Sequence, residues 1–105
     1  MKVAMRLKDD TVCLTGIRPE LLFGLTVAND VYASLGVELV ITSANDARHS
    51  TTSLHYAGCA VELGTRNIPG DPATVAADLK SRLNVDYDVI FEGDHIHLEW
   101  QPRRR

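Results

Sequence analysis

The sequence predicts an α+β fold, in which an antiparallel β-sheet is covered on one side by two main helices. The first observation is that two segments carry apolar residues at the three- and four-residue spacing of amphipathic helices. The second is that short segments rich in β-branched and aromatic residues are separated from them by glycine and proline. With 105 residues, of which 45% are hydrophobic, the chain has the length and composition of one globular domain. We therefore expect a single domain over residues 1–105.

Local signals at the helix ends place both helices. The first is expected over residues 19–35, because it begins with a proline, which is favoured at a first helical position, and Gly36 can end it. The second is expected over residues 72–83, because Asp71 is a good N-cap residue and a proline follows it.

The strands follow from composition and from glycine-containing turns. Residues 11–17 are expected to form a turn or a short strand, and Gly93 marks the turn of a C-terminal hairpin. The basic tail, residues 101–105, is expected to be disordered. Four strands are expected, over residues 37–42, 59–63, 85–91 and 95–100.

Histidines and carboxylates gather in two stretches and indicate a metal site on the open face of the sheet. His55 and Glu62 are seven residues apart. Seven residues span ~10 Å in a helix and ~23 Å in a strand, so the chain has to reverse between them, and Gly58 permits the turn. The second stretch is Asp94-His95-Ile96-His97, in which the two histidines share one face of a strand.

The donor types are those of zinc. A catalytic zinc ion takes three protein ligands and leaves one position for water. His55, Glu62 and either His95 or His97 would complete such a set and leave a carboxylate to act as a base. Taken singly, each histidine is more often an ordinary hydrogen-bonded residue than a ligand. Glu62 strengthens the metal interpretation, because a carboxylate in an otherwise apolar strand needs a metal, a partner or water.

These residues resemble those of a known family, the zinc D-alanyl-D-alanine carboxypeptidases and the related phage endolysin L-alanyl-D-glutamate peptidases. That family has Ser-x-His, then Gly-x-Ala-x-Asp, and later an acid followed three residues on by His. The three blocks recur here in the same order within about residues 37–100, as Ser53-Leu54-His55, Gly58-Cys59-Ala60-Val61-Glu62 and Asp94-His95-Ile96-His97. The resemblance implies a hedgehog-type peptidase fold and a zinc cofactor.

The resemblance also implies a role for each residue. His55, Glu62 and His97 would be the zinc ligands. Asp94 would be the general base, and His95 would lie near the reacting carbonyl. Glu62 departs from the family, which has aspartate there, and the additional methylene moves the carboxylate by about an ångström.

Two further residues would bind substrate by the same resemblance. Arg48 is the candidate for the arginine that the family has upstream of Ser-x-His, although the spacing is shorter. A guanidinium group can hold a carboxylate through two parallel hydrogen bonds. Ser53 belongs to the Ser-x-His block itself. The alternative for both is an ordinary polar loop.

The residue chemistry alone indicates metal-assisted amide hydrolysis. The resemblance implies that the substrate is a peptidoglycan stem peptide, cut at either the L-Ala-D-Glu or the D-Ala-D-Ala bond, as by a phage-type lysis enzyme. The net charge of −3 gives no reason to expect nucleic acid. No apolar stretch has signal-peptide or membrane-span length, so we expect a cytosolic protein. The resemblance to phage lysis enzymes adds the expectation of a monomer that a separate pore releases to the wall, or of a virion-associated protein. The alternatives are a non-catalytic metal- or wall-binding descendant of the same fold and a small virion structural protein.

Overall fold

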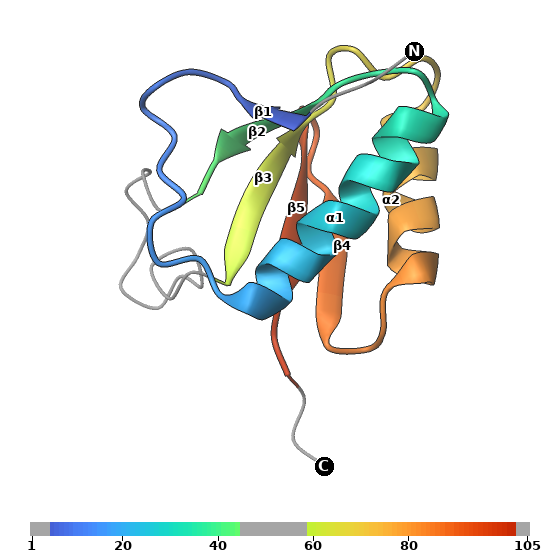
Figure 1. Ribbon diagram of the computed structural model, residues 1–105. Helices are drawn as coiled ribbons and strands as arrows, with labels where there is room; N and C mark the ends of the chain where they lie inside the picture. The colour runs from blue at the N-terminus through green and yellow to red at the C-terminus, as the bar shows by residue number, and fades with distance from the viewer. Residues whose placement is uncertain (1–4, 45–58, 103–105) are drawn as a thin grey trace.

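The structure is a computed structural model that describes residues 5–44 and 59–102. It confirms the α+β class, with one five-stranded sheet and two helices. Figure 1 shows α1 and α2 on the same side of the sheet. The elements in chain order are β1 (Met5–Leu7), α1 (Pro19–Ser34), β2 (Leu39–Ser43), β3 (Ala60–Gly64), α2 (Pro72–Arg82), β4 (Tyr87–Phe91) and β5 (His95–Trp100).

The sheet is mixed, so the expectation of an antiparallel sheet was wrong at one edge. The strand order is β1-β2-β3-β5-β4, and all neighbours are antiparallel except β1 and β2, which run parallel. The chain leaves β1, passes through α1 and enters β2, and a helical crossover of this kind returns the next strand in the same direction. Residues 11–17, expected to form a turn or a short strand, lie in the loop between β1 and α1.

The helix ends are built as the sequence predicts. Gly36 follows α1 with φ +74°, a conformation that glycine adopts without strain. Its backbone N–H donates to the carbonyl of Ala33 at 2.9 Å. At the start of α2, a side-chain oxygen of Asp71 accepts a hydrogen bond from the backbone N–H of Ala73 at 3.0 Å. Gly93 has φ +83° in the turn between β4 and β5.

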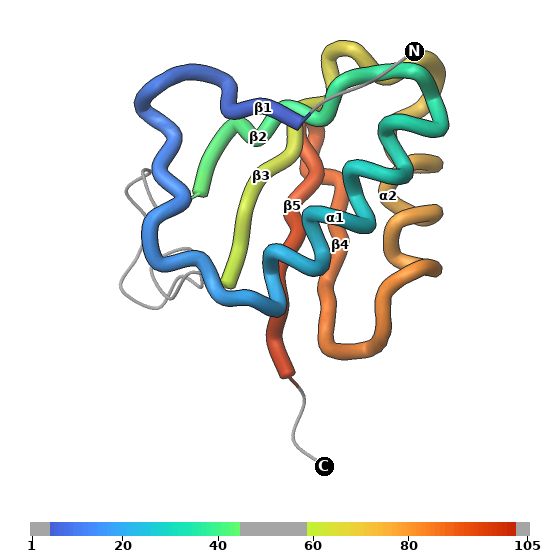
Figure 2. Tube along the Cα trace, viewed as in Figure 1, coloured from blue at the N-terminus to red at the C-terminus, as the bar shows by residue number. Residues whose placement is uncertain are grey.

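The core lies between the sheet and the two helices. Figure 2 follows the chain and shows α1 crossing in front of β5 and β4, with α2 to the right of β4. Alternate residues of the central strands point toward the helices and are fully buried, among them Val61, Leu63, Ile96 and Leu98. The residues between them point to the opposite face, which neither helix covers. Apolar residues of both helices close this core: Leu21, Leu25, Ala28, Val31, Tyr32, Val75, Ala76 and Leu79.

Hydrogen bonds and close packing join α1 to the sheet, among them the hydroxyl of Tyr87 on β4, which donates to the Glu20 carbonyl at 2.7 Å. The hydroxyl of Tyr32 donates to the backbone carbonyl of Gly64 at the end of β3, at 2.9 Å. Gly24 lies against the Tyr87 ring, and a Cβ added at this position would be 3.1 Å from the ring carbon Cε2. In the part of the chain that the structure describes, no helix has both the length and the apolar character needed to cross a membrane.

Candidate functional site

The uncovered face of the sheet brings two of the predicted zinc ligands together. Glu62 on β3 and His97 on β5 are Cα partners in the antiparallel ladder. Side chains of such partners project from the same face, with Cβ atoms about 4.5–5.5 Å apart. His95 lies two residues before His97 and therefore on this face too. The strand pairing thus places Glu62 beside two histidines that follow it by more than thirty positions in the sequence.

The other predicted site residues, Arg48, Ser53 and His55, fall outside the described residues. Among residues 5–44 and 59–102, no three His, Cys, Asp or Glu side chains are arranged to hold a metal ion. Of the three predicted ligands, Glu62 and His97 are described, and a carboxylate and an imidazole are donor groups that zinc takes.

His95 is held between carboxylates on both sides of its ring. Its Nδ1 lies 2.8 Å from Asp94 Oδ1, and its Nε2 lies 3.0 Å from Glu92 Oε1 and 3.6 Å from Glu62 Oε1. Burial of the ring lowers the pKa of His95, but the hydrogen bonds and negative charges of Asp94, Glu62 and Glu92 outweigh burial, and the net shift is upward. The site therefore favours the protonated imidazolium, in which both nitrogens donate.

Asp94 is at the surface, at the first position before β5. Its side chain is 93% exposed, and the hydrogen bond from His95 holds the pKa of its carboxyl below the usual range. Its backbone carbonyl accepts a hydrogen bond from the Thr65 hydroxyl at 2.8 Å, which ties the turn before β5 to the end of β3. Asp94 is thus ionised at neutral pH and fixed beside His95.

Glu99 is a site residue that the sequence analysis missed. Its Oε1 lies 2.6 Å from His97 Nε2, and both side chains are only 16% exposed. A carboxylate bound to a ligand histidine commonly fixes the orientation of the ring. The signal was the two-residue spacing, which places Glu99 and His97 on one face of β5.

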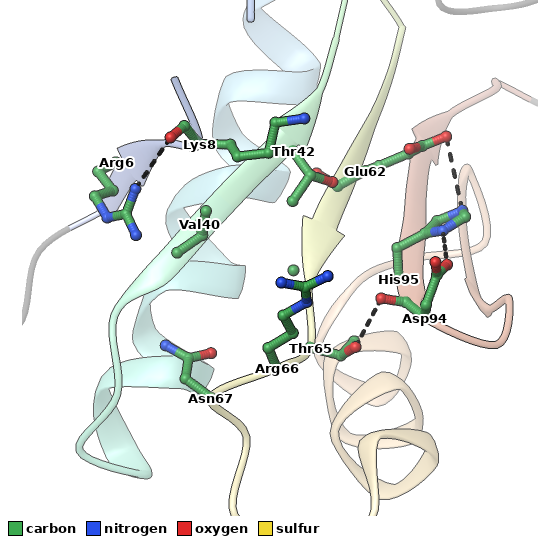
Figure 3. Close-up of a pocket in the computed structure, with 11 residues that line it drawn as sticks. Arg6, Lys8, Val40, Thr42, Glu62, Thr65, Arg66, Asn67, Asp94 and His95 are labelled. Atoms are coloured by element: carbon green, nitrogen blue, oxygen red, sulfur yellow. Dashed lines mark hydrogen bonds and ion pairs between the residues drawn. The ribbon is translucent and has the colours of Figure 1, made fainter. Parts of the chain in front are cut away.

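A cavity of about 480 Å³ opens beside Glu62 and His95. Figure 3 shows Glu62, His95 and Asp94 on one side of it, Arg6 on the other, and the charged ends of Lys8 and Arg66 between them. The volume is within the usual range for small-molecule sites. The lining residues come from β1, β2, β3, the loop after β3 and the start of β5: Arg6, Lys8, Val40, Thr42, Glu62, Gly64, Thr65, Arg66, Asn67, Asp94 and His95.

Comparison with known proteins adds no family to these observations. No protein-family model matches the sequence, and no curated protein matches it either.

Proposed function

We propose that this protein is a zinc-dependent peptidase of the hedgehog-type fold that hydrolyses peptidoglycan stem peptides, as a phage-type lysis enzyme does. The observation that carries the proposal is the pairing of Glu62 with His97 across β3 and β5, beside His95 and a cavity. Glu62 and His97 are two of the three zinc ligands that the resemblance implies, and Asp94, three residues before His97, is the base that it implies.

The metal would be held by His55, Glu62 and His97, with Glu99 fixing the His97 ring. When bound, zinc lowers the pKa of a coordinated water toward about 7 and polarises a carbonyl group. Proton transfer and hydrogen-bond donation would be carried out by side chains of the protein.

Asp94 would accept a proton as general base and return it to the leaving amine. Its exposed carboxylate is ionised, which is the form that a base needs, while the hydrogen bond from His95 lowers its pKa and makes it a weaker proton acceptor than a free aspartate. His95 would donate a hydrogen bond to the oxygen that becomes negative in the transition state, and its raised pKa supports the donor form. Because Asp94 holds Nδ1 of His95 at 2.8 Å, loss of Asp94 would also loosen the ring.

One observation favours a second candidate, a non-catalytic metal- or wall-binding descendant of the fold. Glu62 Oε1 lies 3.6 Å from His95 Nε2, so the longer side chain reaches across to His95. An aspartate at this position would be shorter by one methylene. If the contact with His95 competes with metal binding, Glu62→Asp would bind zinc more tightly and hydrolyse peptide faster than the native chain.

The experiment is digestion of purified peptidoglycan with tag-free protein, with and without a chelator, followed by mass spectrometry of the released fragments. The proposal expects chelator-sensitive release of fragments cut at L-Ala-D-Glu or D-Ala-D-Ala bonds, and the fragment masses identify which. His97→Ala should abolish release, whereas Asp78→Asn, on the exposed face of α2, should not. Zinc binding without any cleavage would leave the non-catalytic candidate.

A further inference from the structure

The cavity has a basic wall that the proposed zinc chemistry does not use. Arg6 and Lys8 enter it from the β1 edge of the sheet, and Arg66 enters from the loop after β3. Glu62 and the Asp94–His95 pair line the same cavity from β3 and the start of β5, and Arg66 is near enough to Asp94 to help lower the pKa of its carboxyl. The two walls therefore carry opposite charge, with the strand β2 residues Val40 and Thr42 between them.

Arg6 is already engaged in holding the fold together. Its Nε donates to a Glu38 side-chain oxygen, and its Nη1 donates to the backbone carbonyls of Leu7 and Lys8, both at 3.3 Å. Asn67 is engaged too, because its amide donates to the backbone carbonyl of Glu38 at 2.8 Å. These contacts fix the rim of the basic wall.

Among the described residues, Arg66 and Lys8 are the cavity cations with the weakest contacts to the protein. No hydrogen bond or close ion pair of the Arg66 guanidinium is present in the described part of the chain, and its charge acts on Asp94 only through space, where it helps to lower the pKa of that carboxyl. Lys8 Nζ has an ion pair with Asp9 at 3.9 Å, and both side chains are about half exposed, so this contact contributes little. Figure 3 shows the Arg66 guanidinium directed into the cavity and the Lys8 side chain extending over β2 past Thr42.

We propose that Arg66 and Lys8 form a carboxylate-binding subsite, which holds the free α-carboxylate of a short peptide while its amide lies against the wall of Glu62 and His95. A planar guanidinium group matches a carboxylate through two parallel hydrogen bonds, and a lysine adds a second positive charge. The volume of about 480 Å³ suits a ligand of dipeptide size.

The acidic wall selects against polyanions. Glu62 and Asp94 line the same cavity, and Glu92 contacts His95 beside it. Like charges would oppose a ligand that is negative at both ends, such as a nucleotide or an oligonucleotide. A peptide that is negative at one end and neutral or positive at the other matches both walls. The proposed carboxylate subsite is inferred from the charged residues that line the cavity. Only the placement of the scissile amide depends on the proposed peptidase function.

The test is an NMR titration of chelator-treated protein with D-alanyl-D-alanine and with its C-terminal amide. We expect binding of the free acid, with shifts at residues lining the cavity, and at least about tenfold weaker binding of the amide. Arg66→Gln should weaken binding of the free acid to the same extent, and Arg66→Lys and Lys8→Gln by less. Arg82→Gln is the matched control, because Arg82 is an exposed arginine on α2 that pairs with Asp78 instead of lining the cavity.

Each outcome has a definite meaning. No binding by the native chain, equal affinity for acid and amide, or an unchanged affinity in Arg66→Gln would overturn the subsite. Displacement of the dipeptide by an equal concentration of inorganic phosphate would overturn the assignment to a carboxylate. Binding that depends on Arg66 in a protein that cleaves no peptidoglycan would uphold the subsite and refute the peptidase. Peptidoglycan cleavage by Arg66→Gln with an unchanged KM would uphold the peptidase and refute the subsite.

Discussion

Tyr32→Phe removes the hydroxyl that joins α1 to the end of β3. Tyr32 is fully buried, and its hydroxyl donates to the Gly64 carbonyl at 2.9 Å. Phenylalanine keeps the ring and its packing, so the change isolates one hydrogen bond. That bond matters to the site because Gly64 lines the cavity and lies two residues beyond Glu62.

The expected cost is about 1 kcal/mol of unfolding free energy, since one intramolecular hydrogen bond contributes about 0.5–1.5 kcal/mol net. For a domain of this size, 1 kcal/mol corresponds to a fall in Tm of about 4–8 °C. Thermal unfolding followed by circular dichroism measures it. Thr26→Val is the control, because the exposed Thr26 hydroxyl donates only to the Leu22 carbonyl within α1, and its loss should cost less than about 0.5 kcal/mol.

The difference in unfolding free energy between the native chain and Tyr32→Phe should decrease at high pH. Burial raises the pKa of Tyr32 far above its usual value of about 10. A group whose pKa is raised by folding contributes stability that is complete below the unfolded-state pKa and is lost as the pH rises above it. The native chain therefore loses this contribution above about pH 10, and the phenylalanine variant does not. Burial also raises the pKa of Tyr87, but that residue is present in both proteins and cancels.

Two results would refute this reasoning. A Tm that stays the same or rises in Tyr32→Phe at pH 7 would mean that the hydroxyl bond contributes nothing. A stability difference that stays constant from pH 8 to pH 11 would mean that the buried hydroxyl does not control the alkaline loss.

The remaining predictions concern the second helix, the packing of Gly24 against Tyr87 and the general base. Asp71→Ala removes the N-cap of α2 and should lower the unfolding free energy, measured by thermal unfolding, by about 1 kcal/mol. The control Asp78→Ala breaks an exposed ion pair and should lower it by less than about 0.5 kcal/mol. Equal losses in the two variants would contradict the capping role of Asp71. Gly24→Leu should lower the unfolding free energy, measured by urea denaturation, by about 1–3 kcal/mol, because even a Cβ at this position would be 3.1 Å from the Tyr87 ring. An unchanged midpoint of urea unfolding would show that the helix can move away from the ring. Asp94→Ala should keep bound zinc and lose at least about 100-fold in turnover, and an unchanged rate would remove Asp94 as the base.

The parts of the fold that the sequence predicted are those with local chemical signals. Proline and aspartate start the helices, Gly36 ends the first, and Gly93 makes the β4–β5 turn, and each acts on its immediate neighbours. The alternation in β5 placed His95 and His97 on one face for the same reason. Such signals do not depend on which strand lies next to which.

The missed features depend on contacts between distant residues. Strand β1 has three residues, too few to show a period, and it is defined by pairing with β2 more than thirty positions along the chain. The basic wall was missed with it, because only that pairing brings Lys8 into the same cavity as Arg66. Glu92 and Glu99 are exceptions, because they lie only three and two residues from His95 and His97, so the local spacing could have indicated both.

The zinc content of tag-free protein, measured by elemental analysis beside His97→Ala, tests the central claim most directly. The account predicts about one zinc ion per chain in the native protein and a large loss in the variant, because His97 would be one of three protein ligands. Both proteins should be compared after soaking in zinc and removal of the excess. Absence of zinc from the native protein even after soaking, or equal zinc in both, would contradict the proposed metal site, and the peptidase proposal would fall with it.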